Sequence, residues 1–82
     1  MKYRLEIKPA ALKQLRALPK DYRRTIGWRI EALTNDLAGD VKRLKARVAK
    51  YRLRVGPYRV LFMLENDLIV VYAVKDRREA YE

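Results

Sequence analysis

The chain has 82 residues, half of them hydrophobic, and a formal net charge of +10 at pH 7. This length and composition predict one small folded domain over residues 1–82 and exclude a disordered chain. The charge indicates an anionic partner, which could be nucleic acid, an acidic membrane surface or an acidic protein.

Cysteine and histidine are both absent, and no apolar run approaches the roughly 20 residues that a membrane-spanning helix needs. The missing cysteines exclude a disulfide framework. The missing histidines argue against a zinc site and against acid–base chemistry by imidazole. We therefore expect a cytoplasmic protein with no cofactor, no bound metal and no membrane partner.

The N-terminal part predicts a strand and a first helix. Residues 2–8 alternate apolar and polar side chains, which is the period of a strand. Pro9 suits the first position of a helix, and Pro19 would end that helix. The apolar stripe between the two prolines consists of Leu12, Leu15 and Leu18.

A second helix is predicted between Asp21, a suitable N-cap, and Gly39, a natural C-terminal stop. Gly27 either weakens this helix by roughly 1 kcal/mol relative to alanine or lets the two helices pack closely. The short connection predicts an antiparallel helical hairpin. The apolar stripe of the second helix consists of Tyr22, Ile26, Ile30, Leu33 and Leu37.

Three further strands are predicted at about residues 50–55, 58–65 and 68–75, after a basic loop. Gly56-Pro57 and Asn66-Asp67 mark the turns between them. The last strand is apolar throughout, as expected of a strand buried on both faces. The order βααβββ predicts an α+β domain: an antiparallel sheet covered on one face by the N-terminal helical hairpin. The place of the first strand in the sheet stays open.

The segment 41–59 is the most informative part of the chain, because it carries eight basic residues and no acid. Tyr51 to Val55 alternates apolar and cationic side chains, as in a strand. If Gly56-Pro57 forms a two-residue turn, Val55 pairs with Tyr58 and Arg54 lies opposite Arg59. Like charges directly opposite are destabilising, so an anion such as a phosphodiester is the expected occupant.

This register predicts which side chains share a face. The helix-covered face would hold Leu53, Val60 and Phe62, and the open face would hold Arg52, Arg54 and Arg59. Arg77 and Arg78 follow the last strand, which returns beside the start of the strand before it. We therefore expect both of them near Arg59, in one cationic patch.

Such a patch could be a solvated face, a binding site for RNA or DNA, or a site of phosphoryl transfer. Guanidinium groups can stabilise a pentacoordinate phosphorane. Arginine stays protonated and moves protons poorly, so Tyr81 is the candidate base, with Lys50 and Lys75 as secondary candidates. Tyr81 could instead stack on a base or pack against the sheet.

The chain resembles the RelE/ParE superfamily of bacterial and archaeal toxins over nearly its whole length. The resemblance rests on the helical hairpin, the block from Tyr51 to Phe62 and the closing motif from Val74 to Tyr81. It implies a toxin–antitoxin module. RelE-type members cleave mRNA in the ribosomal A site and leave a 2′,3′-cyclic phosphate, and a cognate antitoxin covers their basic groove.

The resemblance also implies roles for individual residues. The predicted catalytic set is Arg52, Arg54, Arg59, Arg77 and Tyr81, and contacts to RNA phosphates are expected from Lys42, Arg43, Lys45, Arg47, Lys50, Lys75 and Arg78. RelE proteins commonly have lysines where this chain has Arg52 and Arg54, which moves any proton-transfer role toward Tyr81. The implied partners are a RelB-like antitoxin and a 70S-type ribosome with its mRNA.

Alternatives stay open at this point. A ParE-type toxin would poison DNA gyrase without cutting RNA, and a catalytically weak member would only bind nucleic acid or antitoxin. Arg77 or Arg78 could merely pair with a nearby acid such as Asp76. The basic loop residues could be an ordinary solvated surface. The aromatic residues expected to serve packing are Tyr22, Trp28 and Tyr72.

Overall fold

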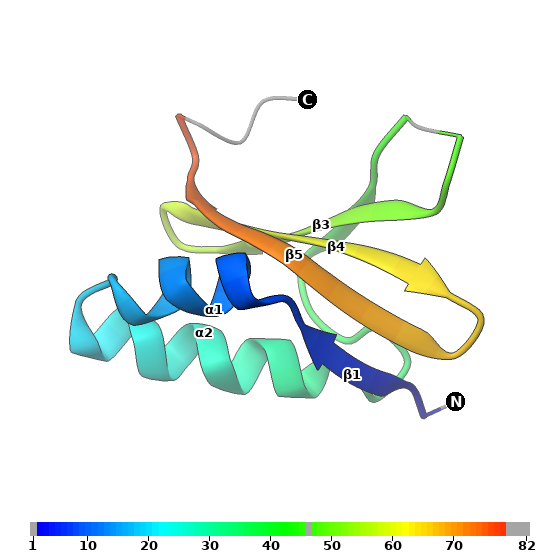
Figure 1. The fold of residues 1–82 in the computed structure, drawn as a ribbon, viewed down its shortest axis with the longest axis horizontal. Coiled ribbons are helices and arrows are strands. Elements are labelled where there is room, and N and C mark those ends of the chain that lie inside the picture. Colours follow the sequence, from blue (N-terminus) through cyan, green and yellow to red (C-terminus); the bar gives the residue numbers. More distant parts are fainter. Residues whose placement is uncertain (1, 46, 79–82) are drawn as a thin grey trace.

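The described part of the chain forms a five-stranded sheet with two helices on one face (Figure 1). A computed structural model describes residues 2–45 and 47–78. Neither helix in this part of the chain is long and apolar enough to span a membrane. The elements are β1 (Arg4–Ile7), α1 (Pro9–Arg16), α2 (Lys20–Ala32), β2 (Val41–Arg43), β3 (Lys50–Val55), β4 (Tyr58–Glu65) and β5 (Leu68–Asp76).

The order of strands in the sheet is β1-β5-β4-β3-β2. The α+β class and the helical hairpin on one face are confirmed, and β2 to β5 pair antiparallel. β1 pairs with β5 in parallel, so the sheet is mixed. This pairing settles the position of β1, which the sequence had left open.

The core lies between the helices and the sheet. Ile26, Ile30 and Leu33 meet Phe62 and its neighbours there, and each of these four side chains is fully buried. β5 is also buried on its other face, where Val70 and Ala73 lie. The prediction of a strand buried on both faces is therefore confirmed. The burial of these apolar side chains is the main stabilising term for so small a domain.

Both helices begin close to where the sequence placed them. α1 starts at Pro9 and buries Ala11 and Leu15. α2 starts at Lys20 with Pro19 as its N-cap, so the prediction of Asp21 as N-cap is wrong. Asp21 lies instead in the first turn, where a carboxylate interacts favourably with the positive end of the helix dipole.

α2 ends at Ala32, well before the predicted stop at Gly39. Tertiary pairing explains the difference, because the carbonyl of Thr34 accepts a hydrogen bond of 2.8 Å from the backbone N–H of Tyr3. The chain then turns through Asp36 and Leu37, both with a φ of 56°. The backbone that a longer helix would need is thus paired with the N-terminal segment.

The predicted basic loop contains a short strand, β2, at the edge of the sheet next to β3. Val41 pairs with Leu53 and packs against the core. The prediction of a basic loop before the strand at about 50–55 was therefore wrong for residues 41–43, which form a strand. Val41 faces the core, and β2 pairs along the edge that β3 would otherwise leave open.

Replacing Gly39 or Gly27 by alanine should have opposite effects on the free energy of unfolding. Gly39 has a φ of +127°, and a Cβ there would lie 2.9 Å from Cδ1 of the fully buried Leu53. We expect Gly39→Ala to lower the free energy of unfolding by about 1–3 kcal/mol. A Cβ at Gly27 would meet nothing within 4 Å. Gly27→Ala should therefore raise the free energy of unfolding by about 0.5–1 kcal/mol.

Urea titrations of the two variants check this pair. A similar loss of stability in both would contradict the assignment, because only Gly39 combines a left-handed backbone with a crowded side. The open space beside Gly27 also excludes close packing of the two helices as the reason for that glycine.

Candidate functional site

A row of cations crosses the sheet on the face away from the helices. Arg54 on β3 lies opposite Arg59 on β4, and Arg59 lies opposite Lys75 on β5. The predicted turn register is confirmed, with Val55 opposite Tyr58. Neighbouring strands are about 4.8 Å apart, so three like charges fall within roughly two strand spacings. Such a row is stabilised by an anion above it.

Arg59 lies at the centre of this row and is held in place. The sequence had led us to expect an exposed side chain on the open face, but the residue is only 9% accessible. Its Nη1 donates hydrogen bonds to the carbonyl oxygens of Gly56 at 3.1 Å and Tyr58 at 2.9 Å. The turn that aligns β3 with β4 therefore also orients the Arg59 guanidinium. A guanidinium that is already oriented loses less conformational entropy when it binds an anion.

The electrostatic environment of Arg59 is strongly cationic. Burial lowers the pKa of Arg59 below its ordinary value, and three neighbouring guanidinium groups lower that pKa further: those of Arg54, Arg52 and Arg77. The carboxylate of Asp40 acts in the opposite direction. Asp40 is a contributor that the sequence did not indicate. Its backbone carbonyl accepts a hydrogen bond of 2.9 Å from the N–H of Arg54, which keeps it near the site.

Arg52 occupies the next row of the same face. It pairs with Lys42 on β2 and with Leu61 on β4. Its Nε is buried, and no described residue offers that atom a hydrogen bond. A buried donor without a partner is costly.

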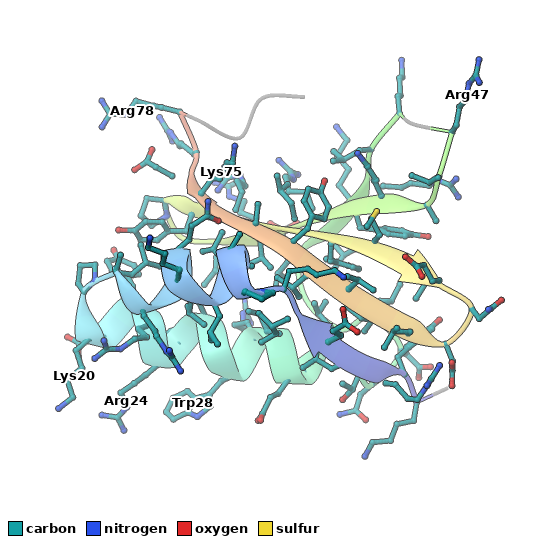
Figure 2. The ribbon with its side chains drawn as sticks, viewed as in Figure 1. Lys20, Arg24, Trp28, Arg47, Lys75 and Arg78 are labelled. Carbon is teal, nitrogen blue, oxygen red and sulfur yellow. The ribbon has the colours of Figure 1, made fainter. Side chains whose placement is uncertain are left out.

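The two arginines after β5 have different surroundings. Arg77 lies near Arg59, as expected, and its backbone N–H donates a hydrogen bond of 2.8 Å to the carbonyl of Pro57. Arg78 forms an exposed ion pair with Asp76 at 3.6 Å. Figure 2 shows Arg78 pointing outward from the end of β5. Arg78 thus forms the surface ion pair that was one alternative, whereas Arg77 occupies the expected position near Arg59.

Asp76 is the acidic partner of Arg78 in this contact. Its Oδ1 accepts a hydrogen bond of 3.0 Å from the backbone N–H of Arg78. This bond, followed by the charge of Arg78, lowers the pKa of the Asp76 carboxyl below its ordinary value. The carboxylate therefore stays ionised at neutral pH and shields Arg78 more than Arg77.

The remaining predicted RNA-contacting residues divide between two faces. Lys42 and Lys50 belong to the face of the arginine row, and the Nζ of Lys50 lies 5.4 Å from the ring centre of Tyr72. Arg43 lies over the ring of Tyr51, which stacks on the core residue Phe62. Arg43 is therefore on the helix-covered side, away from the arginine row.

The loop residues Lys45 and Arg47 are exposed, and Figure 2 shows Arg47 at the far tip of the molecule. Tyr81, the predicted base or stacking residue, lies outside the described residues. The sequence did not single out Tyr72 for this face. It is the extra residue of a β-bulge in β5, since Leu61 pairs with Ala73 and Phe62 with Val71. A bulge changes which residues share a face, and the strand period alone does not reveal it.

The crowding of like charges has a measurable cost. We expect Arg54→Thr to raise the free energy of unfolding by about 0.2–1 kcal/mol at low ionic strength, because it relieves the repulsion with Arg59. The gain should shrink in about 1 M NaCl, where the screening length falls to roughly 3 Å. Urea titrations at both salt concentrations test this. A gain that is independent of salt would point to strand propensity instead, and Arg43→Thr on the other face serves as the control.

The chain matches known proteins over almost its whole length. Residues 5–81 match the family model described as the ParE toxin of the type II toxin–antitoxin system parDE. The RelE1 protein of Methanocaldococcus jannaschii is 33% identical over 88 residues, covering 100% of this chain and 98% of the relative.

Two solved complexes contain chains of the same fold. One is the RelB–RelE antitoxin–toxin complex of Methanococcus jannaschii, with a TM-score of 0.77, 29% identity, and 92% of this chain and 93% of that chain covered. The other is the archaeal RelE–RelB complex of Pyrococcus horikoshii, with a TM-score of 0.77, 28% identity, and 98% and 100% covered. Fold, family model and sequence identity coincide over almost the whole chain, which therefore belongs to the RelE/ParE superfamily of type II toxins.

Proposed function

We propose that this protein is a ribosome-dependent endoribonuclease that cleaves mRNA in the ribosomal A site and so inhibits translation. The observation that carries the proposal is the cationic row centred on Arg59, whose guanidinium is buried, oriented by two backbone carbonyls and surrounded by three further arginines. A preorganised cluster of this kind is suited to the negative charge that develops on a phosphorane.

The reaction is a transesterification in which the 2′-oxygen attacks the adjacent phosphorus. The bond to the 5′-oxygen of the next nucleotide breaks, and the products are a 2′,3′-cyclic phosphate and a 5′-hydroxyl. One proton leaves the 2′-hydroxyl and one joins the departing 5′-oxygen. The reaction needs an aligned phosphodiester and one group for each of the two proton transfers. The ribosome would hold the mRNA in the required geometry.

In this mechanism Arg59 and Arg77 stabilise the phosphorane, and Arg52 and Arg54 hold the neighbouring phosphates. Arg52 lies on the same face as Arg54, in the next row of the sheet. Arginine is a poor proton carrier, so Tyr81 is assigned the role of base, with Lys50 and Lys75 as further candidates. Contacts to RNA phosphates are assigned to Lys42, Lys45, Arg47 and Arg78, and with lower priority to Arg43, because of its position over Tyr51.

The proposed partners follow from the same family. A RelB-like antitoxin would cover the cationic face and hold the toxin inactive, as the complexes of the archaeal relatives suggest. A 70S-type ribosome with its mRNA would be the target. With these partners, the protein would act in the cytoplasm.

A ParE-type activity is the second candidate, because the matching family model is named for ParE toxins. Such a protein would inhibit DNA gyrase and leave mRNA intact. The row of Arg54, Arg59 and Lys75, with Arg52 and Arg77 beside it, favours the nuclease. A toxin acting on gyrase does not need a cluster of cations suited to a phosphorane.

Primer extension on a defined mRNA in a purified translation system distinguishes the two. The nuclease should produce new ends within codons only when ribosomes are present. An intact message with normal protein synthesis would exclude the nuclease and lead to a gyrase supercoiling assay. An intact message with blocked synthesis would mean that the protein occupies the A site without cutting, as a catalytically weak member would.

A further inference from the structure

The second half of β5 forms an edge of the sheet. β1 ends at Ile7, opposite Val71, and the chain then turns into α1. Within the described ranges, no strand pairs with this edge of β5 beyond Val71. α1 lies against it instead (Figure 1). Backbone groups at an unpaired strand edge need hydrogen-bond partners from outside the sheet.

Gln14 supplies one such partner from α1. Its side-chain oxygen Oε1 accepts a hydrogen bond of 2.8 Å from the backbone N–H of Val74. The neighbouring positions Ala11 and Leu15 are apolar and buried. An apolar side chain at position 14 would leave the N–H of Val74 without this acceptor, on a residue that is almost fully buried. A buried donor without a partner is costly, so the polar side chain of Gln14 satisfies a specific backbone group.

The other edge of the same segment of β5 is paired with the cationic site. Lys75 lies opposite Arg59 on β4. Two residues later, the backbone N–H of Arg77 donates a hydrogen bond of 2.8 Å to the carbonyl of Pro57. The segment 74–77 is therefore held on one edge by Gln14 and on the other by β4 and the turn before it. This segment carries two of the cations that surround Arg59.

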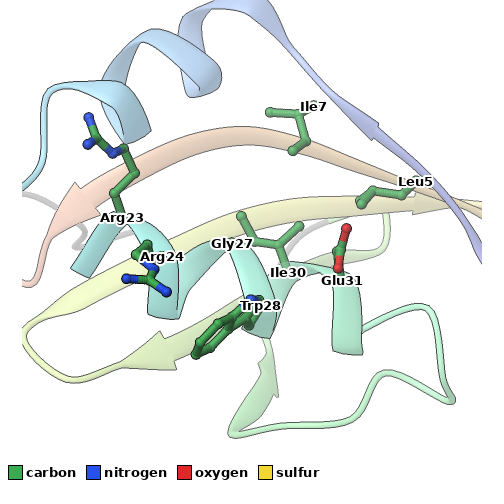
Figure 3. A pocket seen from close by; sticks show the side chains of 8 residues that line it. All are labelled: Leu5, Ile7, Arg23, Arg24, Gly27, Trp28, Ile30 and Glu31. Atoms are coloured by element: carbon green, nitrogen blue, oxygen red, sulfur yellow. The ribbon is translucent and has the colours of Figure 1, made fainter. Parts of the chain in front are cut away.

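The packing around the bond from Val74 to Gln14 is loose. A hollow of about 390 Å³ lies beside Gln14 and is lined on the β5 side by Val74, Lys75 and Asp76. The helical layer leaves a second hollow of about 440 Å³ between α2 and β1 (Figure 3). Trp28 was expected to serve packing, but it lines this second hollow and is 65% exposed. Where side chains leave such space, directional hydrogen bonds contribute more to the position of a strand end than close packing does.

We propose that Gln14 is a positioning residue for the cationic row. By accepting the N–H of Val74, it fixes the end of β5 and so keeps Lys75 and Arg77 beside Arg59. Gln14 lies on the helix-covered side, so it acts through the strand and not by contact with RNA. The role rests on the proposed function, because the quantity that it affects is the rate of mRNA cleavage. A displacement of about 1 Å in a catalytic group can lower a rate by about 10²-fold.

The test compares two substitutions of Gln14 in the full chain. Gln14→Met keeps the length of the side chain and removes the oxygen acceptor, whereas Gln14→Glu keeps an acceptor oxygen at the same distance along the side chain. Gln14→Met should lower kcat for ribosome-dependent cleavage about tenfold or more. The KM for ribosomes should change less than about threefold, because substrate binding as a whole is unaffected. Gln14→Glu should retain at least about a third of the wild-type kcat.

NMR spectra of the isotope-labelled full chain give a structural readout that does not depend on activity. The amide proton of Val74 should exchange with solvent faster in Gln14→Met, because it has lost its acceptor. The amide resonance of Arg77 should shift in the same variant. Gln14→Glu should preserve the slow exchange at Val74.

Two further variants serve as controls. Ile26→Val removes one methylene group from the fully buried core beneath α2. It should melt at a lower temperature than the wild type and keep the wild-type kcat at any temperature where it is folded. Lys13→Met changes an exposed residue next to Gln14 on α1 and should match the wild type in kcat and in the exchange at Val74.

The role of Gln14 and the proposed function fail in different ways. Wild-type kcat in Gln14→Met, together with faster exchange at Val74, would reduce the hydrogen bond to a purely structural contact. Equal losses of kcat in Gln14→Met and Gln14→Glu would show that the acceptor oxygen does not matter. An equal loss in Ile26→Val would assign the effect to stability. Each of these results refutes the positioning role alone, whereas an absence of cleavage by the wild-type chain refutes the proposed function and the positioning role with it.

Discussion

Replacing Arg59 by glutamine is expected to reduce ribosome-dependent mRNA cleavage by about 10²–10³-fold, the usual loss when one preorganised donor to a developing oxyanion is removed. The loss should appear in the maximal cleavage rate more than in the affinity for ribosomes. This follows because Arg59 is buried and already oriented by Gly56 and Tyr58. In the proposed mechanism it would therefore act on one phosphorus rather than attract the ribosome as a whole.

Two variants control this prediction. Arg59→Lys keeps the charge but loses the planar fork, so it should recover only part of the activity. Arg29→Gln removes an equal charge from an exposed site on α2 and should cleave like the wild type. Wild-type cleavage by Arg59→Gln, with thermal melting confirming its fold, would refute the proposed role. Equal losses in Arg59→Gln and Arg29→Gln would indicate general electrostatic attraction instead.

The largest effect on stability is expected from Phe62→Ala, at about 3–5 kcal/mol. Phe62 is fully buried, and its ring stacks on Tyr51 with centroids 5.3 Å apart. At roughly 0.05–0.15 kcal/mol per residue, a chain of 82 residues has a total stability of only about 4–12 kcal/mol. The substitution should therefore remove a large part of it, and leave much of the protein unfolded if the wild type lies at the lower end.

The adjacent residue gives the control for this substitution. Met63 lies on the other face of β4 and is only half-buried, so Met63→Ala should cost clearly less. Urea denaturation followed by circular dichroism measures both variants. A loss below about 1 kcal/mol for Phe62→Ala would mean that the core closes around the vacated volume, since the cost of such a substitution depends on how far the site collapses.

Two parts of the candidate site could be predicted from sequence because they depend on local physics. A two-residue turn at Gly56-Pro57 aligns the strands on either side of it, so Arg54 and Arg59 had to face each other. The period of a strand then places Val60 and Phe62 toward the helices and the arginines on the other face. Both relations span only a few residues of chain.

The surroundings of Arg59 could not be predicted in this way. The orientation of its side chain depends on the turn carbonyls that it folds back to reach. The approach of Arg77 was expected, but the sequence did not indicate that Asp40 contributes to the electrostatic environment of Arg59. Tyr72 joins the face of the arginine row because β5 contains a bulge, and strict alternation would have assigned its neighbours differently. The role of Tyr81 stays a prediction.

The sequence by itself thus determined the class of fold, the order of the elements apart from β2, the register of β3 with β4 and the cationic character of one face. These follow from side-chain period, turn residues and net charge, which act between near neighbours. Only the tertiary structure decided that α2 ends at Ala32, that β1 joins β5 in parallel and that Trp28 faces outward. Each of these depends on which distant backbone groups and side chains meet, and the free energy of such contacts is not encoded in any single segment.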